Sequence, residues 1–355
     1  MRHDEMPSIA AERALAGTDV LPLRGTIAAA LPPHVREAVR EATVDEHAVT
    51  PPSRGHLELR AAIARSLEPS PDPEREVLVT NGAMHALSLV FRALLEAGDE
   101  VIVPTPSYFF QGLVERAGGV FVPVPTREAG GWRWDLDAIE AAVTQRTRLL
   151  VVTNPNNPTG YLPSRRTIDD LLAIAARQGL TVVTDEAYER CIHDGFLESA
   201  WGAPNVVLVR SLGKSLAMPA WRLGFVAGPE PAVEACLREL EWDVIRVAHV
   251  TQRAAAAALD GPQEWLEDVA AGYRADRDAA HAAISDDALL SAPLPPAGPF
   301  LFVDLGGLHL QNLLAAGLPL VDGAAFGVPG HARLPFGGAA ELAGELHRRL
   351  LLVTR

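Results

Sequence analysis

The chain has 355 residues, of which 48% are hydrophobic and 21% charged, and its formal net charge is −14. This length suits one large domain with a smaller companion, and the acidic balance excludes a protein that binds nucleic acid by neutralising phosphates. Two cysteines, Cys191 and Cys236, exclude a disulfide scaffold and belong to no metal-ligand motif, which favours a reducing cytoplasm.

The first segment, residues 1–20, is a charged arm without a continuous apolar core, so it does not have the pattern of a secretory signal. No later apolar run approaches the roughly 20 residues that a membrane-spanning helix needs. We therefore expect a cytoplasmic protein that associates with neither membranes nor nucleic acid.

Short β-branched runs then alternate with segments whose apolar residues have helical spacing. The alternation predicts crossover units, a mainly parallel central sheet with helices on both faces, and thus an α/β fold. The predicted strands are 77–79, 100–103, 120–122, 148–152, 181–184 and 206–209, and the predicted helices include 84–97, 111–117 and 168–178. In such a sheet, binding residues gather in the loops that follow the carboxyl ends of strands.

From Pro229 onwards the pattern changes to a long alanine-rich helix that runs through 254–258 towards Ala283. A proline-rich turn at 293–299 leads into a predicted strand at 300–305. A second strand at 332–335 and a last helix at 339–351 follow. This change indicates a smaller α+β domain. We assign residues 21–45 to its N-terminal part, 46–249 to the large domain and 250–355 to its C-terminal part.

Two loops after predicted strands have the features of a ligand site. After 77–79, Gly82, Ala83 and Met84 place backbone N–H groups at the start of a helix, where a phosphate binds readily. After 148–152, the turn Asn154-Pro-Asn-Asn157-Pro is rigid, and an asparagine amide in this turn can face a phenolate oxygen. Each loop alone is also typical of an ordinary turn.

Two more loops supply charged groups. Asp185 follows the strand 181–184, with Tyr188 three residues later. A buried carboxylate needs a cation, and a protonated pyridine nitrogen supplies one, although Asp185 alone would be read as a helix cap. After 206–209, Ser211 and Lys214 lie in a small-residue turn, with Arg222 eight residues after the lysine. Lys214 can form an imine with an aldehyde and Arg222 can hold its phosphate, so the four loops together indicate pyridoxal 5'-phosphate.

On these motifs the chain resembles the class I/II aminotransferases of the fold-type I pyridoxal-phosphate enzymes, from about Gly25 to the C-terminus. The resemblance implies their fold, a mainly parallel sheet plus a smaller α+β domain. It also implies that Lys214 is the Schiff-base lysine, Asp185 the partner of the pyridine nitrogen, and Asn157 and Tyr188 the donors to the phenolic oxygen.

The resemblance extends to the phosphate and the substrate. Ser211 and Arg222 would bind phosphate beside the backbone of residues 82–84. Tyr108 falls where the family stacks an aromatic ring on the cofactor, although an aromatic residue there is also typical of a core. Arg333 matches the arginine that grips the substrate α-carboxylate, and Gly25 would let its backbone approach the substrate. Asn157 is also a candidate for substrate binding.

Three positions depart from the family pattern. Thr50 stands where many relatives have a tyrosine that reaches the cofactor phosphate of the neighbouring subunit, and His47 or Arg54 are candidate substitutes. Met84 stands where relatives often have a hydroxyl or amide side chain. The segment between Leu305 and Val321 is short, which leaves the substrate lid open to question.

The resemblance implies a homodimeric aminotransferase that moves an amino group between an L-amino acid and a 2-oxo acid through an aldimine on Lys214. The freed lysine would act as the general base on the α-proton. Two alternatives remain at this point: a lyase or cyclase acting on a specialised, basic or guanidino amino acid, and a non-catalytic binding protein of the same fold. No second arginine is assigned to a distal carboxylate, and no metal ligands are assigned.

Overall fold

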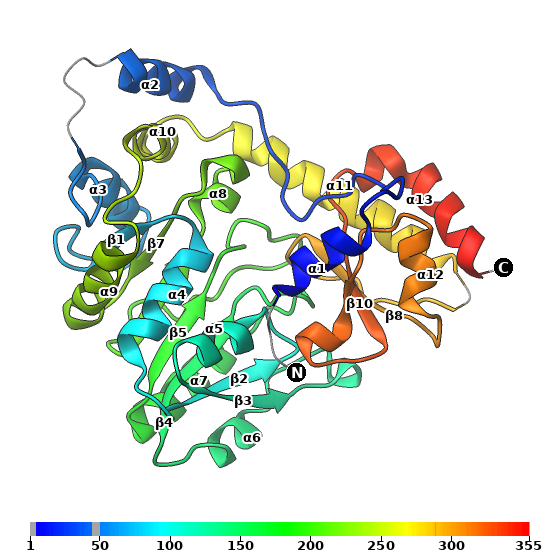
Figure 1. Ribbon diagram of the computed structural model, residues 1–355, viewed down its shortest axis with the longest axis horizontal. Helices are drawn as coiled ribbons and strands as arrows, with labels where there is room; N and C mark the ends of the chain where they lie inside the picture. Colours follow the sequence, from blue (N-terminus) through cyan, green and yellow to red (C-terminus); the bar gives the residue numbers. More distant parts are fainter. Residues whose placement is uncertain (1–4, 45–49, 288, 355) are drawn as a thin grey trace.

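The computed structural model describes residues 5–44, 50–287 and 289–354, which form one large and one small β-sheet (Figure 1). The strands of the large sheet are β1 (Val77–Thr80), β2 (Glu100–Thr105), β3 (Val120–Pro125), β4 (Thr147–Thr153), β5 (Thr181–Asp185), β6 (Val206–Arg210) and β7 (Gly224–Ala227). Their order is β1-β7-β6-β5-β4-β2-β3, and only β7 runs antiparallel to its neighbours. The predicted parallel sheet is therefore confirmed, and each predicted strand is present.

Strand β7 was not predicted, because a four-residue strand directly after the Lys214–Arg222 segment is too short for its periodicity to be recognised. It lies second from the edge of the sheet, between β1 and β6. Since β1, β4, β5 and β6 are all parallel, their carboxyl ends lie along the same edge of the sheet. The loops predicted to bind a ligand therefore share this edge.

Both faces of the large sheet are covered, because its strands bury alternate residues on opposite sides. Val101, Val151 and Val183 pack with α4, whereas Leu150 and Val182 pack with α6 and α7. The helices of this part are α3 (Leu57–Arg65), α4 (Ala83–Leu94), α5 (Phe110–Arg116), α6 (Leu136–Ala141), α7 (Arg165–Gln178), α8 (Leu212–Ser215) and α9 (Glu230–Asp243), with the 3-10 turns η1 (Glu128–Gly130) and η2 (Pro219–Trp221).

The small sheet is antiparallel and consists of β8 (Phe300–Asp304), β10 (His331–Pro335) and β9 (Val321–Asp322), in this order. It lies with α1 (Pro7–Ala14), α11 (Trp265–Ser285), α12 (Leu310–Ala315) and α13 (Ala339–Thr354) on one side of the molecule (Figure 1). The 3-10 turn η3 (Gly323–Phe326) follows β9, and α2 (Pro33–Val44) packs on α10 (His249–Asp260). Arg24 pairs with Gly337, which ties the N-terminal segment to the end of β10.

The long alanine-rich helix predicted after Pro229 is wrong. The segment forms three helices, α9, α10 and α11, which are separated at residues 244–248 and 261–264. Helix α10 ends at Asp260 because Pro262 lacks an N–H and clashes with a continuing helix, and because it disfavours helical geometry in Gly261 before it. Alanine-rich composition indicated helix throughout and did not reveal these breaks.

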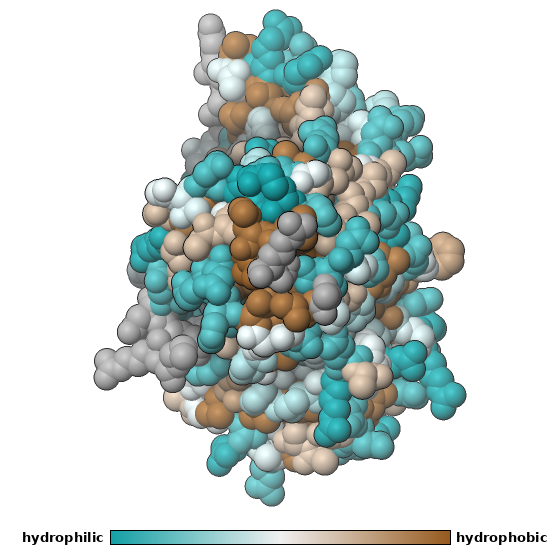
Figure 2. All heavy atoms as spheres, turned by 90° about the vertical axis from the view of Figure 1, so that its right-hand side faces the viewer, coloured by the Kyte–Doolittle hydropathy of each residue, from teal (hydrophilic) through white to brown (hydrophobic). Residues whose placement is uncertain are grey.

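Figure 2 views the side of the molecule on which α12 and α13 lie, and hydrophilic side chains dominate it around a central apolar area. Exposed apolar residues of the C-terminal region include Leu289 and Leu352, which are 43% and 65% exposed. Among the described helices, none combines the length and the apolar character needed to cross a membrane.

Candidate active site

Lys214 lies in α8, just beyond the carboxyl end of β6, and it is the only lysine in the sequence. Its Nζ is 3.9 Å from the centre of the Tyr188 ring. Burial lowers the pKa of Lys214, and the neighbouring Tyr108 and Asp185 partly oppose that change. A lysine whose pKa is lowered by burial is a typical nucleophile and general base.

Asp185 ends β5 in the middle of the large sheet and is 4% exposed. Its Oδ1 accepts a hydrogen bond of 3.0 Å from the backbone N–H of Ala187. Burial raises the pKa of Asp185, and the charge of Lys214 acts in the opposite direction. One amide hydrogen bond compensates a buried carboxylate only in part, so a cation bound beside it would be strongly favoured.

The start of α4 forms a cradle with Arg222. Gly82 has φ +84°, and a Cβ added there would lie 2.9 Å from Nη2 of Arg222. A Cβ on Gly224 would lie 2.8 Å from the backbone nitrogen of Ala83, so the absence of a side chain in β7 lets this loop pack closely. Free N–H groups at a helix start next to a guanidinium form an anion site. Ser211 is buried directly after β6, at the N-cap of α8, and its hydroxyl caps no helix amide.

Arg333 lies in the middle of β10, 8% exposed, and its Nη1 donates a hydrogen bond of 3.0 Å to Oδ1 of Asn157. Its guanidinium carbon lies 4.2 Å from the ring centre of Phe300, 5.0 Å from that of Phe326 and 5.7 Å from that of Phe109. We call these three rings the aromatic shell.

Burial lowers the pKa of Arg333, and its Nε is buried without a hydrogen-bond acceptor in the described part of the protein. A buried guanidinium with an unused donor suits a planar carboxylate, which accepts two parallel hydrogen bonds. The structure therefore brings Arg333 and Asn157 together, although their sequence positions lie far apart.

Gly25 and Tyr108 approach the same place from other segments. A Cβ on Gly25 would lie 2.8 Å from Cε1 of Phe300, so the glycine lets the N-terminal segment pass directly over the aromatic shell. Two residues later, the backbone N–H of Ile27 donates to the hydroxyl of Tyr273 at 2.7 Å. Tyr108 is close enough to Lys214 for each to influence the pKa of the other.

A buried ionic network behind these residues was not predicted. Glu186 is fully buried and accepts hydrogen bonds from Nε and Nη2 of Arg210 at 3.1 and 2.6 Å and from the hydroxyl of Ser199. Glu186 follows Asp185 directly, and Arg210 directly precedes Ser211. The pair therefore fixes β5 against β6 at the point where both strands enter the site. The close packing at Gly224 and the aromatic shell were not predicted either.

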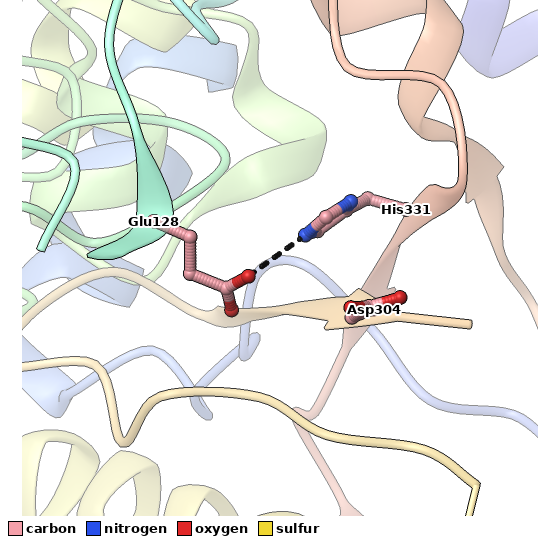
Figure 3. A group of neighbouring side chains, drawn as sticks. All are labelled: Glu128, Asp304 and His331. Carbon is pink, nitrogen blue, oxygen red and sulfur yellow. Dashed lines mark hydrogen bonds and ion pairs between the residues drawn. The ribbon is translucent and has the colours of Figure 1, made fainter. Parts of the chain in front are cut away.

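Close to Arg333 along β10, three side chains from separate segments meet (Figure 3). Nε2 of His331 lies 3.3 Å from Oε2 of Glu128, and one potential ligand atom from each of Glu128, Asp304 and His331 lies within 4.8 Å of the others. Glu128 belongs to the loop after β3, whereas Asp304 and His331 are paired on the small sheet. The contact between His331 and Glu128 therefore holds the beginning of β10 against the loop that follows β3.

The positions that depart from the family pattern have different environments. Thr50 is exposed, and His47 lies outside the described residues. Arg54 forms an ion pair with Glu234 and also donates to the carbonyl oxygen of Arg75, so partners within the chain occupy its guanidinium. Met84 is half-buried in the first turn of α4.

The comparisons with known proteins agree with this geometry. The family model "Aminotransferase class I and II" matches residues 23–350. The chain belongs to this family. It is 31% identical over 327 residues to the aspartate/prephenate aminotransferase of Thermus thermophilus, covering 87% of this chain and 84% of the relative. It is 34% identical over 318 residues to an arginine–pyruvate transaminase of Pseudomonas aeruginosa, covering 84% and 80%.

A solved structure of the Thermus thermophilus aspartate aminotransferase with maleate has a TM-score of 0.92 to this aminotransferase at 30% identity. The match covers 99% of this chain and 97% of the other. The fold is therefore that of fold-type I aminotransferases, and the chain is an enzyme that transfers amino groups. The lyase or cyclase alternative is not favoured, and neither is a non-catalytic protein.

Proposed function

We propose that this aminotransferase binds pyridoxal 5'-phosphate through Lys214 and moves an amino group between an L-amino acid and a 2-oxo acid. The observation that carries the proposal is the buried carboxylate of Asp185 on the same edge of the sheet as Lys214, with no cation bonded to it among the described residues. A protonated pyridine nitrogen is the cation that this site would accept. When bound, the cofactor supplies an aldehyde and an electron-withdrawing ring.

The remaining residues fit the other parts of that cofactor. The cradle of Gly82, Ala83 and Met84, with Ser211 and Arg222 beside it, suits the phosphate. Asn157 and Tyr188 would donate to the phenolic oxygen, and burial raises the pKa of Tyr188, which keeps its hydroxyl protonated for that task. The Tyr108 side chain would cover the face of the ring.

In the proposed reaction Arg333 binds the substrate α-carboxylate with the donors that Asn157 leaves free, and Gly25 lets the backbone lie close to the substrate. The lowered pKa of Lys214 increases the fraction of neutral amine at a given pH. Its Nζ takes the proton from the α-carbon and later returns a proton on the path to the 2-oxo acid. Tyr188, packed against Nζ, limits the positions that the amine can adopt.

Reductive trapping tests this proposal directly, since Lys214 is the only lysine in the sequence. After borohydride treatment with pyridoxal phosphate, peptide mass mapping should find the added mass at Lys214. Lys214→Ala and Lys214→Arg should lose both the visible absorption of the bound cofactor and the turnover, and the arginine variant keeps the positive charge as a matched control. Unchanged absorption and turnover in both variants would contradict the assignment.

We also propose a homodimer in the cytoplasm, as the family resemblance implies. Trp242 in the last turn of α9 and Ile245 just after that helix are 94% and 56% exposed, and apolar residues so exposed are typical of interaction surfaces. Cys191 and Cys236 are buried and unpaired, which agrees with a reducing compartment. Sedimentation at about twice the chain mass of 37.9 kDa would support the dimer, and sedimentation as a single chain would contradict it.

A further inference from the structure

A cavity of about 240 Å³ lies beside the aromatic shell. Its wall is mainly apolar and is contributed by Met6 of the N-terminal arm, Met84 at the start of α4, Phe109 and Leu113 around α5, and Ala325 in η3. These residues come from four separate segments of the chain. Met6 also packs against the buried cluster that contains Phe109 and Phe326.

Two residues of the cavity wall, Phe109 and Met84, also belong to the proposed site. Phe109 belongs to its wall and to the aromatic shell, 5.7 Å from the guanidinium carbon of Arg333. The ring of Phe109 is 5.0 Å from that of Phe326, the residue after Ala325. Met84 belongs to the phosphate cradle. A substrate with its carboxylate on Arg333 and its α-carbon facing Lys214 therefore has a cavity next to it for the side chain.

The charges around this cavity do not suit a second carboxylate. Arg333 and Arg222 are assigned to the α-carboxylate and the phosphate, and no lysine other than Lys214 exists in the sequence. The charged residues of the wall, Glu5 and Arg116, are both exposed and have opposite signs. A carboxylate buried against Met6, Met84 and Leu113 would lose its hydration without gaining a dedicated cation.

We propose that this cavity holds the side chain of the amino donor, and that the enzyme prefers large apolar or aromatic amino acids to dicarboxylic ones. This inference rests on the proposed function. An apolar cavity of roughly 150 Å³ is large enough for benzene. The cavity of about 240 Å³ therefore has room for a side chain such as that of leucine or phenylalanine.

The test uses the holoenzyme and measures the second-order rate constant of the first half-reaction with each of five amino acids. These are phenylalanine, leucine, alanine, aspartate and glutamate. Burial of a large apolar side chain predicts a preference of roughly tenfold or more for phenylalanine or leucine over aspartate and glutamate. Equal or faster reaction with the dicarboxylates would overturn the inference while leaving the proposed function intact. Reaction with none of a full amino-acid panel would overturn the proposed function itself.

Two variants locate the preference in the cavity. Met84→Lys places a cation in the wall and should shift the aspartate-to-phenylalanine ratio towards aspartate by roughly tenfold or more. Ala325→Leu narrows the cavity and should lower the phenylalanine-to-alanine ratio. Ala324→Leu is the matched control, because Ala324 is exposed and does not line this cavity. Circular dichroism and cofactor absorbance verify folding, and unchanged ratios in both folded variants would overturn the assignment.

Discussion

Replacing Gly82 with alanine perturbs the proposed phosphate cradle by one methyl group. Gly82 has φ +84° and ψ 170°, a conformation that is nearly exclusive to glycine, so the backbone strain is about 1–3 kcal/mol. The new Cβ would also lie 2.9 Å from Nη2 of Arg222. The guanidinium is the flexible end of an exposed side chain and moves away at little cost, but it then leaves the position from which it would bind phosphate.

We therefore expect Gly82→Ala to lower the free energy of unfolding of the cofactor-free protein by about 1–3 kcal/mol in denaturant titration. Losing a hydrogen bond to a charged group costs about 1.5–3 kcal/mol, so the affinity for pyridoxal phosphate should fall roughly 10- to 150-fold in an absorbance titration. Gly179→Ala is the control, because Gly179 also has positive φ, +67°, but its Cβ would meet nothing within 4 Å. If both variants bind the cofactor as the parent does, the cradle is not where the phosphate binds.

Asp185→Asn should weaken cofactor binding by about 3–5 kcal/mol, because a buried cation would lose its charged partner. The native pKa of Asp185 is raised above its unfolded value, so its charge costs stability once the pH exceeds the native pKa. At neutral pH the cofactor-free variant should therefore unfold at the same or higher denaturant concentration, and a marked loss of stability would contradict this reasoning. Arg333→Lys keeps the charge but loses the planar fork, so kcat/KM for amino acids should fall roughly tenfold or more at unchanged cofactor affinity; unchanged kcat/KM would refute the role of Arg333.

The residues that sequence reasoning located correctly lie where chain order dictates position. Asp185 ends a strand of the mainly parallel sheet, and Asn157 and Lys214 each follow one. Parallel strands bring their carboxyl ends to a common edge. Alternation of strands and helices was therefore sufficient to predict that these side chains share an edge. The burial of Asp185 and Asn157 is a consequence of their place at this edge.

The unpredicted parts depend on contacts between distant segments. Phe109, Phe300 and Phe326 surround Arg333 from three separate elements, and each alone is typical of an ordinary core aromatic. Glu186 and Arg210, which form an ion pair, are sequence neighbours of the predicted site residues Asp185 and Ser211. The sequence pattern at both positions indicates only the end of a strand, so it did not reveal the pair. The break after α10 was missed because the alanine-rich composition outweighed the signal of Gly261 and Pro262.

Met84 connects the two proposed halves of the site through different atoms. Its backbone belongs to the helix start that would hold the phosphate, and its side chain lines the neighbouring cavity. Because the backbone N–H is common to every residue except proline, the side chain can change without removing a phosphate donor. The fold thus separates cofactor binding, which depends on main-chain geometry and strand ends, from side-chain selectivity, which depends on residues such as Met84. On this reasoning Met84→Lys should change which amino acid reacts more than it changes how tightly the cofactor binds.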